Sequence, residues 1–168
     1  GSTYTYRCSY DTAKVYLDLQ VAAAESSGNK KLVQKAWQAA GNFYARQGQF
    51  ILAVESYLNI LKYFDGDESS RDYIIAHGNI GECYRRMGNP KRALHYLERE
   101  RVLAEQYGEP TGIGQSYREL GYVYLALGDA DKALECMLKV KPKERSAPVN
   151  YADLCEALVK AYLMKGKH

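Results

Sequence analysis

The sequence predicts an all-α protein made of repeated antiparallel helix pairs, and three observations support this. Apolar residues recur three and four apart, as they do on amphipathic helices. Glycines that can end a helix stand between these segments. Most tellingly, four positions repeat the same residue at a spacing of 40: Gly41, Gly81 and Gly121; Tyr44, Tyr84 and Tyr124; Gly48, Gly88 and Gly128; Ala53, Ala93 and Ala133. A period of this length is typical of an α-solenoid, in which each repeat packs against its neighbours.

Each repeat is expected to contain a first helix, A, and a second helix, B, joined by a tight turn. In the second copy, Gly88 can end helix A in the left-handed conformation, Asn89 can cap helix B, and Pro90 fits its first turn. Gly128 and Asp129 repeat this arrangement in the third copy. We expect helices at residues 10–26, 31–47, 50–64, 71–87, 90–106, 112–127, 130–140 and 148–165.

The first glycine of the pattern lies inside helix A, where glycine costs about 1 kcal/mol relative to alanine. A repeated cost of this kind indicates close packing between the two helices of a pair. We expect a side chain of helix B to approach this glycine, at or near the matching Ala53, Ala93 or Ala133.

The third copy departs from the pattern, because Pro142 and the segment KPKERSAP are expected to end its B helix early. Tyr162 and Gly166 then resume the pattern at a spacing of 38, with Val159 in place of the first glycine. The chain is therefore predicted to be a single array over 1–168: a partial repeat with helix B only at 10–28, repeats at 31–66, 71–107 and 111–141, and a partial repeat with helix A only at 148–168. Gly1 and Ser2 resemble a cloning remnant, and both ends resemble cuts through a longer array.

Composition and charge are those of an ordinary soluble protein, with 46% hydrophobic and 26% charged residues and a formal charge of +3. No apolar run is long enough to span a bilayer. The four cysteines, Cys8, Cys83, Cys136 and Cys155, have neither metal-ligand nor redox spacing. We therefore expect a reduced, intracellular setting, in the cytoplasm or the nucleus.

The shared pattern resembles the tetratricopeptide repeat over nearly the whole chain. The matching residues are Trp37, Ala40, Gly41, Tyr44, Ala53 and Tyr57 in the first copy; Ile80, Gly81, Tyr84, Ala93 and Leu97 in the second; and Tyr117, Leu120, Gly121, Tyr124, Ala133 and Met137 in the third. The 40-residue period is longer than the usual one and is similar to the long repeats of Pins/LGN-type spindle-orientation scaffolds and Tonsoku-like proteins. The resemblance implies a right-handed superhelix and a non-catalytic scaffold or adaptor that needs no cofactor.

The resemblance also implies that the A helices line a concave groove that holds a peptide. Groove positions in the family map here to Lys35, Gln38, Asn42, Arg46, Asn79, Glu82, Arg85, Arg86, Gln115, Arg118, Glu119 and Tyr122. This polar set of mixed charge suits a peptide held through its backbone by Asn and Gln and, where it is acidic, through its side chains by Arg. The alternative for any one of these residues is a solvated helix face.

One subclass of the family grips a C-terminal carboxylate with two asparagines and several cations. Asn42 and Asn79 fall at its asparagine positions. Gln38, Gln115 and Glu119 stand where cations are needed, and Glu119 would repel the carboxylate. We therefore disfavour recognition of a chaperone tail.

Other classes of function are less well supported. His77, His95 and His168 have no nucleophile or carboxylate at a recognisable local spacing, and Cys83 and Cys155 fall in packing columns, so we expect no catalytic or metal site. The glycine-rich stretch at Gly108 lacks the ending of a phosphate loop and is interpreted as an inter-repeat loop. The acidic run from Asp65 has too few ligands at calcium-loop spacing and is interpreted as a solvated turn.

Cations are dense between residues 85 and 101, which raises the possibility of nucleic-acid binding. Glu98 and Glu100 interrupt them, however, and a solvated or peptide-binding face is the better interpretation. Self-association of an array with uncapped ends is the main alternative to peptide binding.

Overall fold

The computed structural model describes residues 2–63, 66–140 and 148–166, with side chains for 10–63, 66–140 and 152–166. The described part is helical, with no strand among its residues. Its helices are α1 (Ser2–Ser26), α2 (Lys30–Arg46), α3 (Phe50–Lys62), α4 (Arg71–Arg86), α5 (Pro90–Tyr107), α6 (Pro110–Ala126), α7 (Ala130–Lys139) and α9 (Pro148–Lys165). All expected helices are present, and their ends agree to within two residues except at the start of α1.

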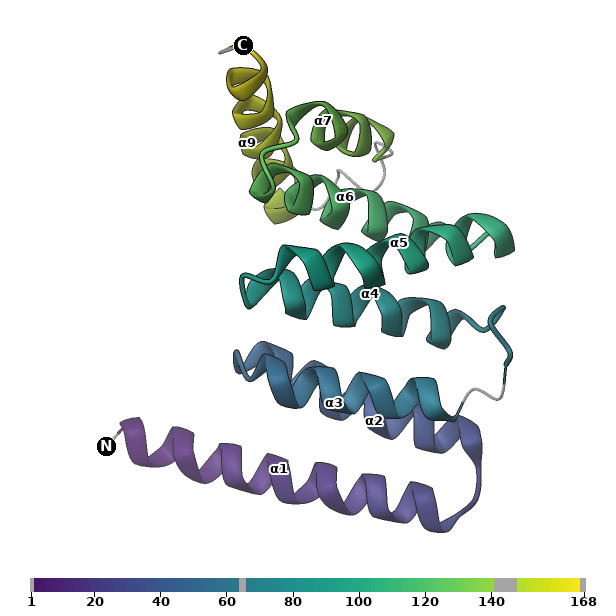
Figure 1. Ribbon diagram of the computed structural model, residues 1–168. Helices are drawn as coiled ribbons and strands as arrows, with labels where there is room; N and C mark the ends of the chain where they lie inside the picture. The colour runs from purple at the N-terminus through teal and green to yellow at the C-terminus, as the bar shows by residue number, and fades with distance from the viewer. Residues whose placement is uncertain (1, 64–65, 141–147, 167–168) are drawn as a thin grey trace. The chain divides into compact units, whose positions relative to one another are not determined.

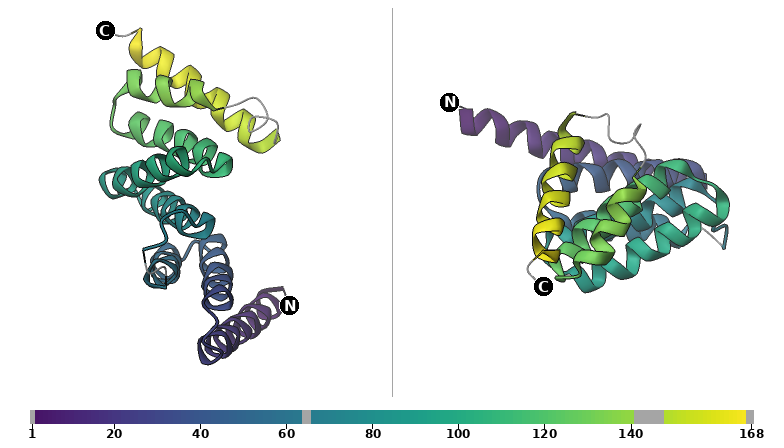
Figure 2. Two further views of the ribbon diagram at one scale, coloured as in Figure 1. Left: turned by 90° about the vertical axis from the view of Figure 1, so that its right-hand side faces the viewer. Right: turned by 90° about the horizontal axis from the view of Figure 1, so that it is seen from above.

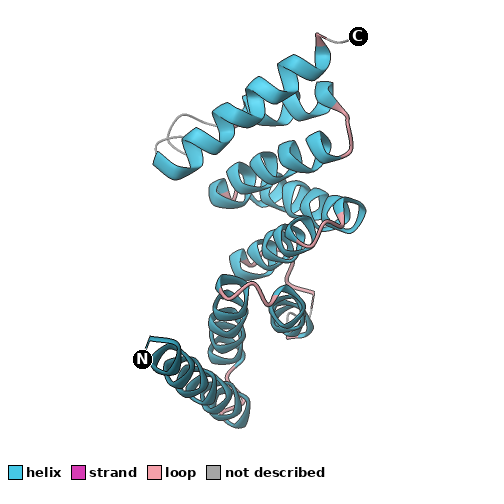
Figure 3. Ribbon diagram, turned by 90° about the vertical axis from the view of Figure 1, so that its left-hand side faces the viewer, coloured by secondary structure: helices cyan, strands magenta, loops and turns pink. Residues whose placement is uncertain are grey.

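Two compact units divide the chain, Gly1–Gly66 and Asp67–His168. In the first unit, α2 packs against both α1 and α3. In the second, α4 to α7 pack in chain order, α7 packs against α9, and α6 also contacts both α4 and α9. Short loops join the helices of each hairpin (Figures 1 and 3). In the second unit α4, α6 and α9 are therefore successive A helices in contact, and α6, α7 and α9 lie together in Figure 2.

The turns between A and B helices follow the expected chemistry. Gly88 and Gly128 adopt φ of 72° and 82°, a region that favours glycine. The Asn89 side chain accepts a hydrogen bond from the backbone of Arg92, and Pro90 begins α5. Asp129 caps α7 in the same way. These residues end one helix and start the next within two or three positions.

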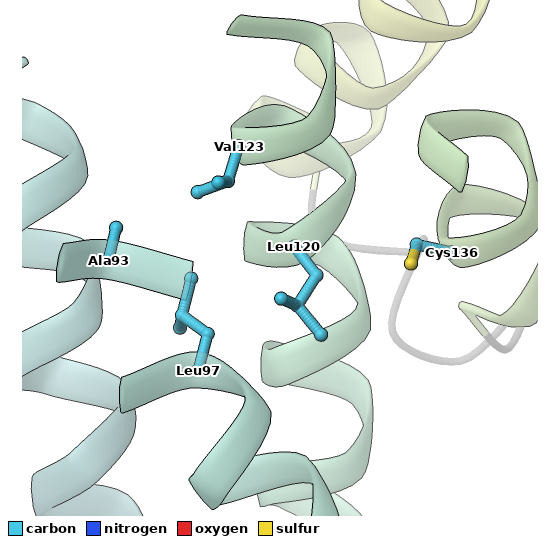
Figure 4. Packing of buried hydrophobic residues seen from close by; sticks show 5 residues of the cluster. All are labelled: Ala93, Leu97, Leu120, Val123 and Cys136. Atoms are coloured by element: carbon cyan, nitrogen blue, oxygen red, sulfur yellow. The ribbon is translucent and has the colours of Figure 1, made fainter. Parts of the chain in front are cut away.

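The repeated helix glycines allow close packing, but the partner differs from the one expected. A Cβ built at Gly81 would lie 2.6 Å from Leu97 Cγ, and one at Gly121 would lie 2.6 Å from Met137 Cγ. A Cβ built at Gly41 would overlap the ring of Tyr57 in the same way. The side chain over the glycine is therefore one helical turn beyond the alanine, because the small alanine lets the B helix approach and the next large residue fills the space. Figure 4 shows Ala93 and Leu97 of α5 facing Leu120 and Val123 of α6, in the cluster of buried residues that also includes Cys136.

Two other expectations are corrected. Helix α1 begins at Ser2 rather than at residue 10. The glycine-rich stretch after Gly108 is not a loop, because α6 begins at Pro110 and the Glu109 side chain caps it. Gly112 is buried and leaves room for Ala104 and Ile74, so close packing explains the glycine. The predicted break at Pro142 lies outside the described residues, as does Asp65, and so do the side chains of Cys8 and His168.

Candidate functional site

A hollow of about 530 Å³ lies on the face formed by the A helices of the second unit. We call it the unit-2 groove. Helix α4 contributes Glu82 and Arg85, because these two residues lie about one turn apart on one helix face. The other lining residues are Arg118, Glu119, Tyr122, Leu125 and Ala126 of α6, and Asp153, Glu156, Ala157 and Lys160 of α9.

An ion pair between α4 and α6 crosses this groove. Arg85 Nε donates to Glu119 Oε2 at 2.6 Å, and the Arg85 guanidinium lies 5.2 Å from the centre of the Tyr122 ring. Arg118 Nε is 3.5 Å from the other carboxylate oxygen of Glu119. Only 5% of the Glu119 side chain is exposed, so this charge-assisted contact is shielded from water. Two guanidinium groups therefore share one buried carboxylate.

Five of the eight groove residues predicted in this unit line the hollow: Glu82, Arg85, Arg118, Glu119 and Tyr122. Gln115 lies beside it, in a smaller hollow of about 330 Å³ at the start of α6 that Arg118 also lines. Asn79 is half-buried and is not among the lining residues. Arg86 is exposed and lies 3.6 Å from Glu82.

The fourth A helix supplies lining residues that the sequence analysis missed. If Val159 takes the place of the signature glycine, the family's groove positions fall on the residues that line the hollow: Asp153, Glu156, Ala157 and Lys160. The signal was present in the resumed Tyr162 and Gly166 pattern. These groove positions were not recognised, because the spacing changes from 40 to 38 and valine replaces the glycine.

The predicted groove residues of the first unit lie on α2. Gln38 donates to Asn42 Oδ1 at 3.0 Å, and the Tyr57 hydroxyl donates to the same oxygen at 2.9 Å. Lys35 and Arg46 are exposed on the same helix. The Asn42 carbonyl is therefore already occupied within its own unit.

Glu100 has an environment that the sequence analysis did not predict. It was counted with the charges of a solvated or peptide-binding face, but it is 0% exposed in the structure. Its carboxyl group occupies the place that a side chain at Gly78 would take. Burial raises the pKa of Glu100 well above its ordinary value, and the nearby Glu119 and Glu82 raise that pKa further while Arg118 lowers it. The 40-residue spacing held the signal, because Ile60 and Val140 are the equivalent residues and both are buried.

Burial also raises the pKa of Glu82, and the charge of Glu119 adds to that effect. The acidic groups of the groove therefore influence one another, and the guanidinium groups of Arg85, Arg86 and Arg118 oppose the effect on Glu82.

Much of the cation-rich segment is engaged by acidic partners. Arg99 pairs with Glu68, and Arg101 pairs with both Glu98 and Glu105. Arg92 lies over the Tyr84 ring. These pairs reduce the positive charge that a nucleic-acid backbone would meet.

The histidine and cysteine interpretations are tested in part. His77 is 6% exposed, its Nδ1 lies 3.0 Å from the Tyr73 carbonyl oxygen, and burial lowers its pKa, as fits a packing residue. Burial raises the pKa of the Cys83 thiol to about 12, which leaves it protonated and unreactive. Cys155 is half-buried rather than part of the core. Within the described ranges, no group of three or more potential metal ligands occurs, and no helix has the length and apolar character needed to cross a bilayer.

The antiparallel helix pairs, their internal glycines and the contacts between successive A helices define an α-solenoid of helical hairpins. The family model described as tetratricopeptide repeat matches residues 32–101 and 72–140, and the chain belongs to that family. Tetratricopeptide repeats are generally protein-interaction scaffolds. The likeness to the long-repeat subtype stays a prediction.

Two curated proteins are similar to parts of the chain. The RxLR effector protein SFI4 of Phytophthora infestans is 29% identical over 131 residues, which cover 74% of this chain and 39% of that protein. The response regulator aspartate phosphatase E of Bacillus subtilis is 27% identical over 95 residues, which cover 56% of this chain and 25% of that protein. The chain therefore matches well under half the length of either relative.

Solved structures confirm the fold class. BtubC (BKLC) from P. vanneervenii has a TM-score of 0.79 at 18% identity, over 96% of this chain and 68% of that one. The first TPR domain of human RPAP3 has a TM-score of 0.62 at 16% identity, over 80% and 97% of the two chains. The TPR2B domain of yeast Sti1, solved in a complex with pHsp70, has a TM-score of 0.61 at 13% identity, over 77% and 96%. At these identities the likeness shows the fold alone.

Proposed function

We propose that this chain is a non-catalytic interaction module whose unit-2 groove binds a segment of a partner protein. The observation that carries the proposal is the hollow itself, which is built on three A helices and combines apolar surface with charged groups. Tyr122, Leu125 and Ala157 offer contact area for an apolar side chain. Sites that bind peptides typically combine such an anchor with polar contacts that fix the register.

The charges of the lining favour a ligand without net negative charge. Four carboxylates, those of Glu82, Glu119, Asp153 and Glu156, face three cations in the lining. The arginines of the predicted groove, Arg85 among them, suggested a ligand with acidic side chains. In the structure, such a ligand would compete with Glu119 for the same guanidinium, and it would leave the buried Glu119 carboxylate without that partner. The same cost would apply to a free C-terminal carboxylate.

The test is to select ligands and then remove the apolar contact. Short peptides are selected from a displayed random library against the whole chain, and the affinity of the best peptide is measured by fluorescence anisotropy. The substitution Tyr122→Ala should weaken binding by a factor of about ten or more, because aromatic anchors dominate such interfaces. Tyr107→Ala, at an exposed tyrosine near the end of α5, is the matched control and should leave the affinity unchanged.

Equal affinities in the two variants would place the binding site elsewhere. Self-association is the alternative, because Val159, Tyr162 and Leu163 of α9 are each more than half exposed. Sedimentation that depends on protein concentration without any ligand would favour it. An intracellular setting also stays a prediction, in keeping with Cys83 and Cys136, which are buried as free thiols.

A further inference from the structure

Glu100 stands at a position where the neighbouring repeats have apolar core residues. Its equivalents at a spacing of 40 are Ile60 and Val140, which are 0% and 1% exposed. Glu100 is equally buried, and among the described residues neither of its carboxylate oxygens has a hydrogen-bond partner. Because leaving a buried polar group unsatisfied is costly, this position calls for an explanation beyond packing.

The location of the carboxyl group relates it to the groove. It lies where a side chain at Gly78 would begin, so α5 presents its acid group at a position that belongs to α4. The residues equivalent to Gly78 in the first and third copies are Gln38 and Arg118, both predicted groove positions. Glu82, one turn further along α4, lines the hollow. The second repeat therefore has a glycine where the other two copies have a predicted groove side chain, with a buried carboxyl group behind it, although neither residue is among those that line the hollow.

The acidic groups around this carboxyl group are paired with cations, but Glu100 is not. The groups that act on Glu100 are Glu82 on α4 and both Glu119 and Arg118 on α6. Arg85 of α4 pairs with Glu119. Arg86 of α4 lies 3.6 Å from Glu82, so each of the other two carboxyl groups has a guanidinium partner, and Glu100 has none among the described residues.

We propose that the unit-2 groove recognises a lysine or arginine side chain of the partner, which docks beside Gly78 and pairs with the carboxyl group of Glu100, the acid of this cluster that has no partner among the described residues. This inference rests on the proposed function and names the chemistry of its ligand. The carboxyl group of Glu100, which is buried and has no hydrogen-bond partner among the described residues, is where we expect the cation to bind, because a charged donor would satisfy both of its oxygens.

Docking of a cation has a consequence that can be measured without any variant. In the free protein burial and the neighbouring carboxylates raise the pKa of Glu100 and so favour its protonated form. A bound cation favours the ionised carboxylate, so the peptide should bind with release of a proton into the solvent. Affinity should accordingly increase as the pH is raised toward the pKa of Glu100 in the free protein.

The experiment uses the peptide selected above and a copy in which its lysine or arginine is replaced by methionine. Calorimetric titration at pH 7, in two buffers of different ionisation enthalpy, counts the protons released on binding. We expect release of up to one proton with the cationic peptide and none with the methionine peptide. The cationic peptide should also bind more tightly, by a factor of about ten.

The substitution Glu100→Gln keeps the shape of the side chain and removes its charge. It should abolish the proton release and lower the affinity for the cationic peptide about ten-fold, while the affinity for the methionine peptide stays the same. Glu55→Gln, at an exposed glutamate of α3, is the matched control and should change neither quantity. If Glu100→Gln does not fold, the proton count of the unmodified chain still decides.

Selected peptides without a lysine or arginine, or binding without proton release, would overturn the inference. Should Tyr122→Ala still weaken those peptides, the proposed function would stand and only the cationic ligand would be wrong. Failure of both Tyr122→Ala and Glu100→Gln to alter binding would remove the groove as the site altogether.

Discussion

Two glycines of α4, Gly78 and Gly81, lie one turn apart and serve different neighbours. Gly81 receives Leu97 of α5, and Gly78 receives Glu100, which lies one turn beyond Leu97 on the same helix. Both glycines allow α5 to approach closely. The first contact is apolar and recurs in each full repeat, at Gly41 and Gly121. The second contact is polar and occurs in the second repeat. In the first and third repeats the residues equivalent to Gly78 are Gln38 and Arg118.

This difference distinguishes a contact that every repeat needs for packing from a contact that is specific to the second repeat. A contact that recurs at every period is explained by packing between A and B helices, which every repeat shares. A glycine that faces a buried acid in a single repeat has no such general explanation. It costs helix stability without restoring apolar contact, so its role belongs to the chemistry of this particular repeat.

The largest expected effect concerns the recurring glycine. Gly81→Leu should lower the free energy of unfolding by about 1–3 kcal/mol, because the new side chain overpacks against Leu97. Urea denaturation followed by circular dichroism measures the change. In a Leu97→Ala background the same substitution should be less damaging, since the space over residue 81 is then open. A Gly81→Leu variant as stable as the parent protein would mean that this contact is loose.

The repeat period was enough to predict the helix pairs, because it fixes which residues share a column. Helix ends, turn glycines and caps such as Asn89 followed from local chemistry. The start of α1 could not be predicted in this way, because the threonines, serines and tyrosines of residues 2–9 have weak helix propensity. The glycine-rich stretch at the start of α6 was interpreted as a loop, because Gly112 resembles a loop residue until its tight contacts with Ala104 and Ile74 are known.

The groove was partly predictable for the same reason. Tyr122, Glu119 and Arg85 fall in family positions, and the same counting applied to α9 would have found its residues. Pairing within the groove was not predictable, because the contact of Arg85 with Glu119 depends on how α4 and α6 pack. The burial of Glu100 could have been suspected from its apolar column, but the missing partner is a property of the folded structure.

The next expected effect, smaller within any one pH unit, is a dependence of stability on pH that comes from Glu100. Its pKa is raised in the folded state, so its contribution is fully present below the ordinary pKa of about 4.5 and is lost as the pH rises toward the folded pKa. Within that window the stability should fall by about 1.4 kcal/mol per pH unit relative to Glu100→Gln. Urea denaturation of both proteins between about pH 5 and pH 8 measures the difference, in which other titrating groups cancel. Parallel curves would mean that Glu100 titrates normally.

The smallest expected effect tests the single-repeat glycine. Alanine at position 78 gains about 1 kcal/mol of helix propensity, but its Cβ would lie on the Glu100 carboxyl group. In a Glu100→Ala background that obstacle is gone, so adding Gly78→Ala should stabilise the protein by about 0.5–1 kcal/mol. In the parent background the same substitution should be less favourable, because the Glu100 side chain has to move. Urea denaturation of the four proteins of this cycle measures the coupling. Equal effects of Gly78→Ala in both backgrounds would mean that Glu100 is not the reason why position 78 is a glycine. The contact of Gly78 with Glu100 could then be replaced, unlike the contact of Gly81 with Leu97.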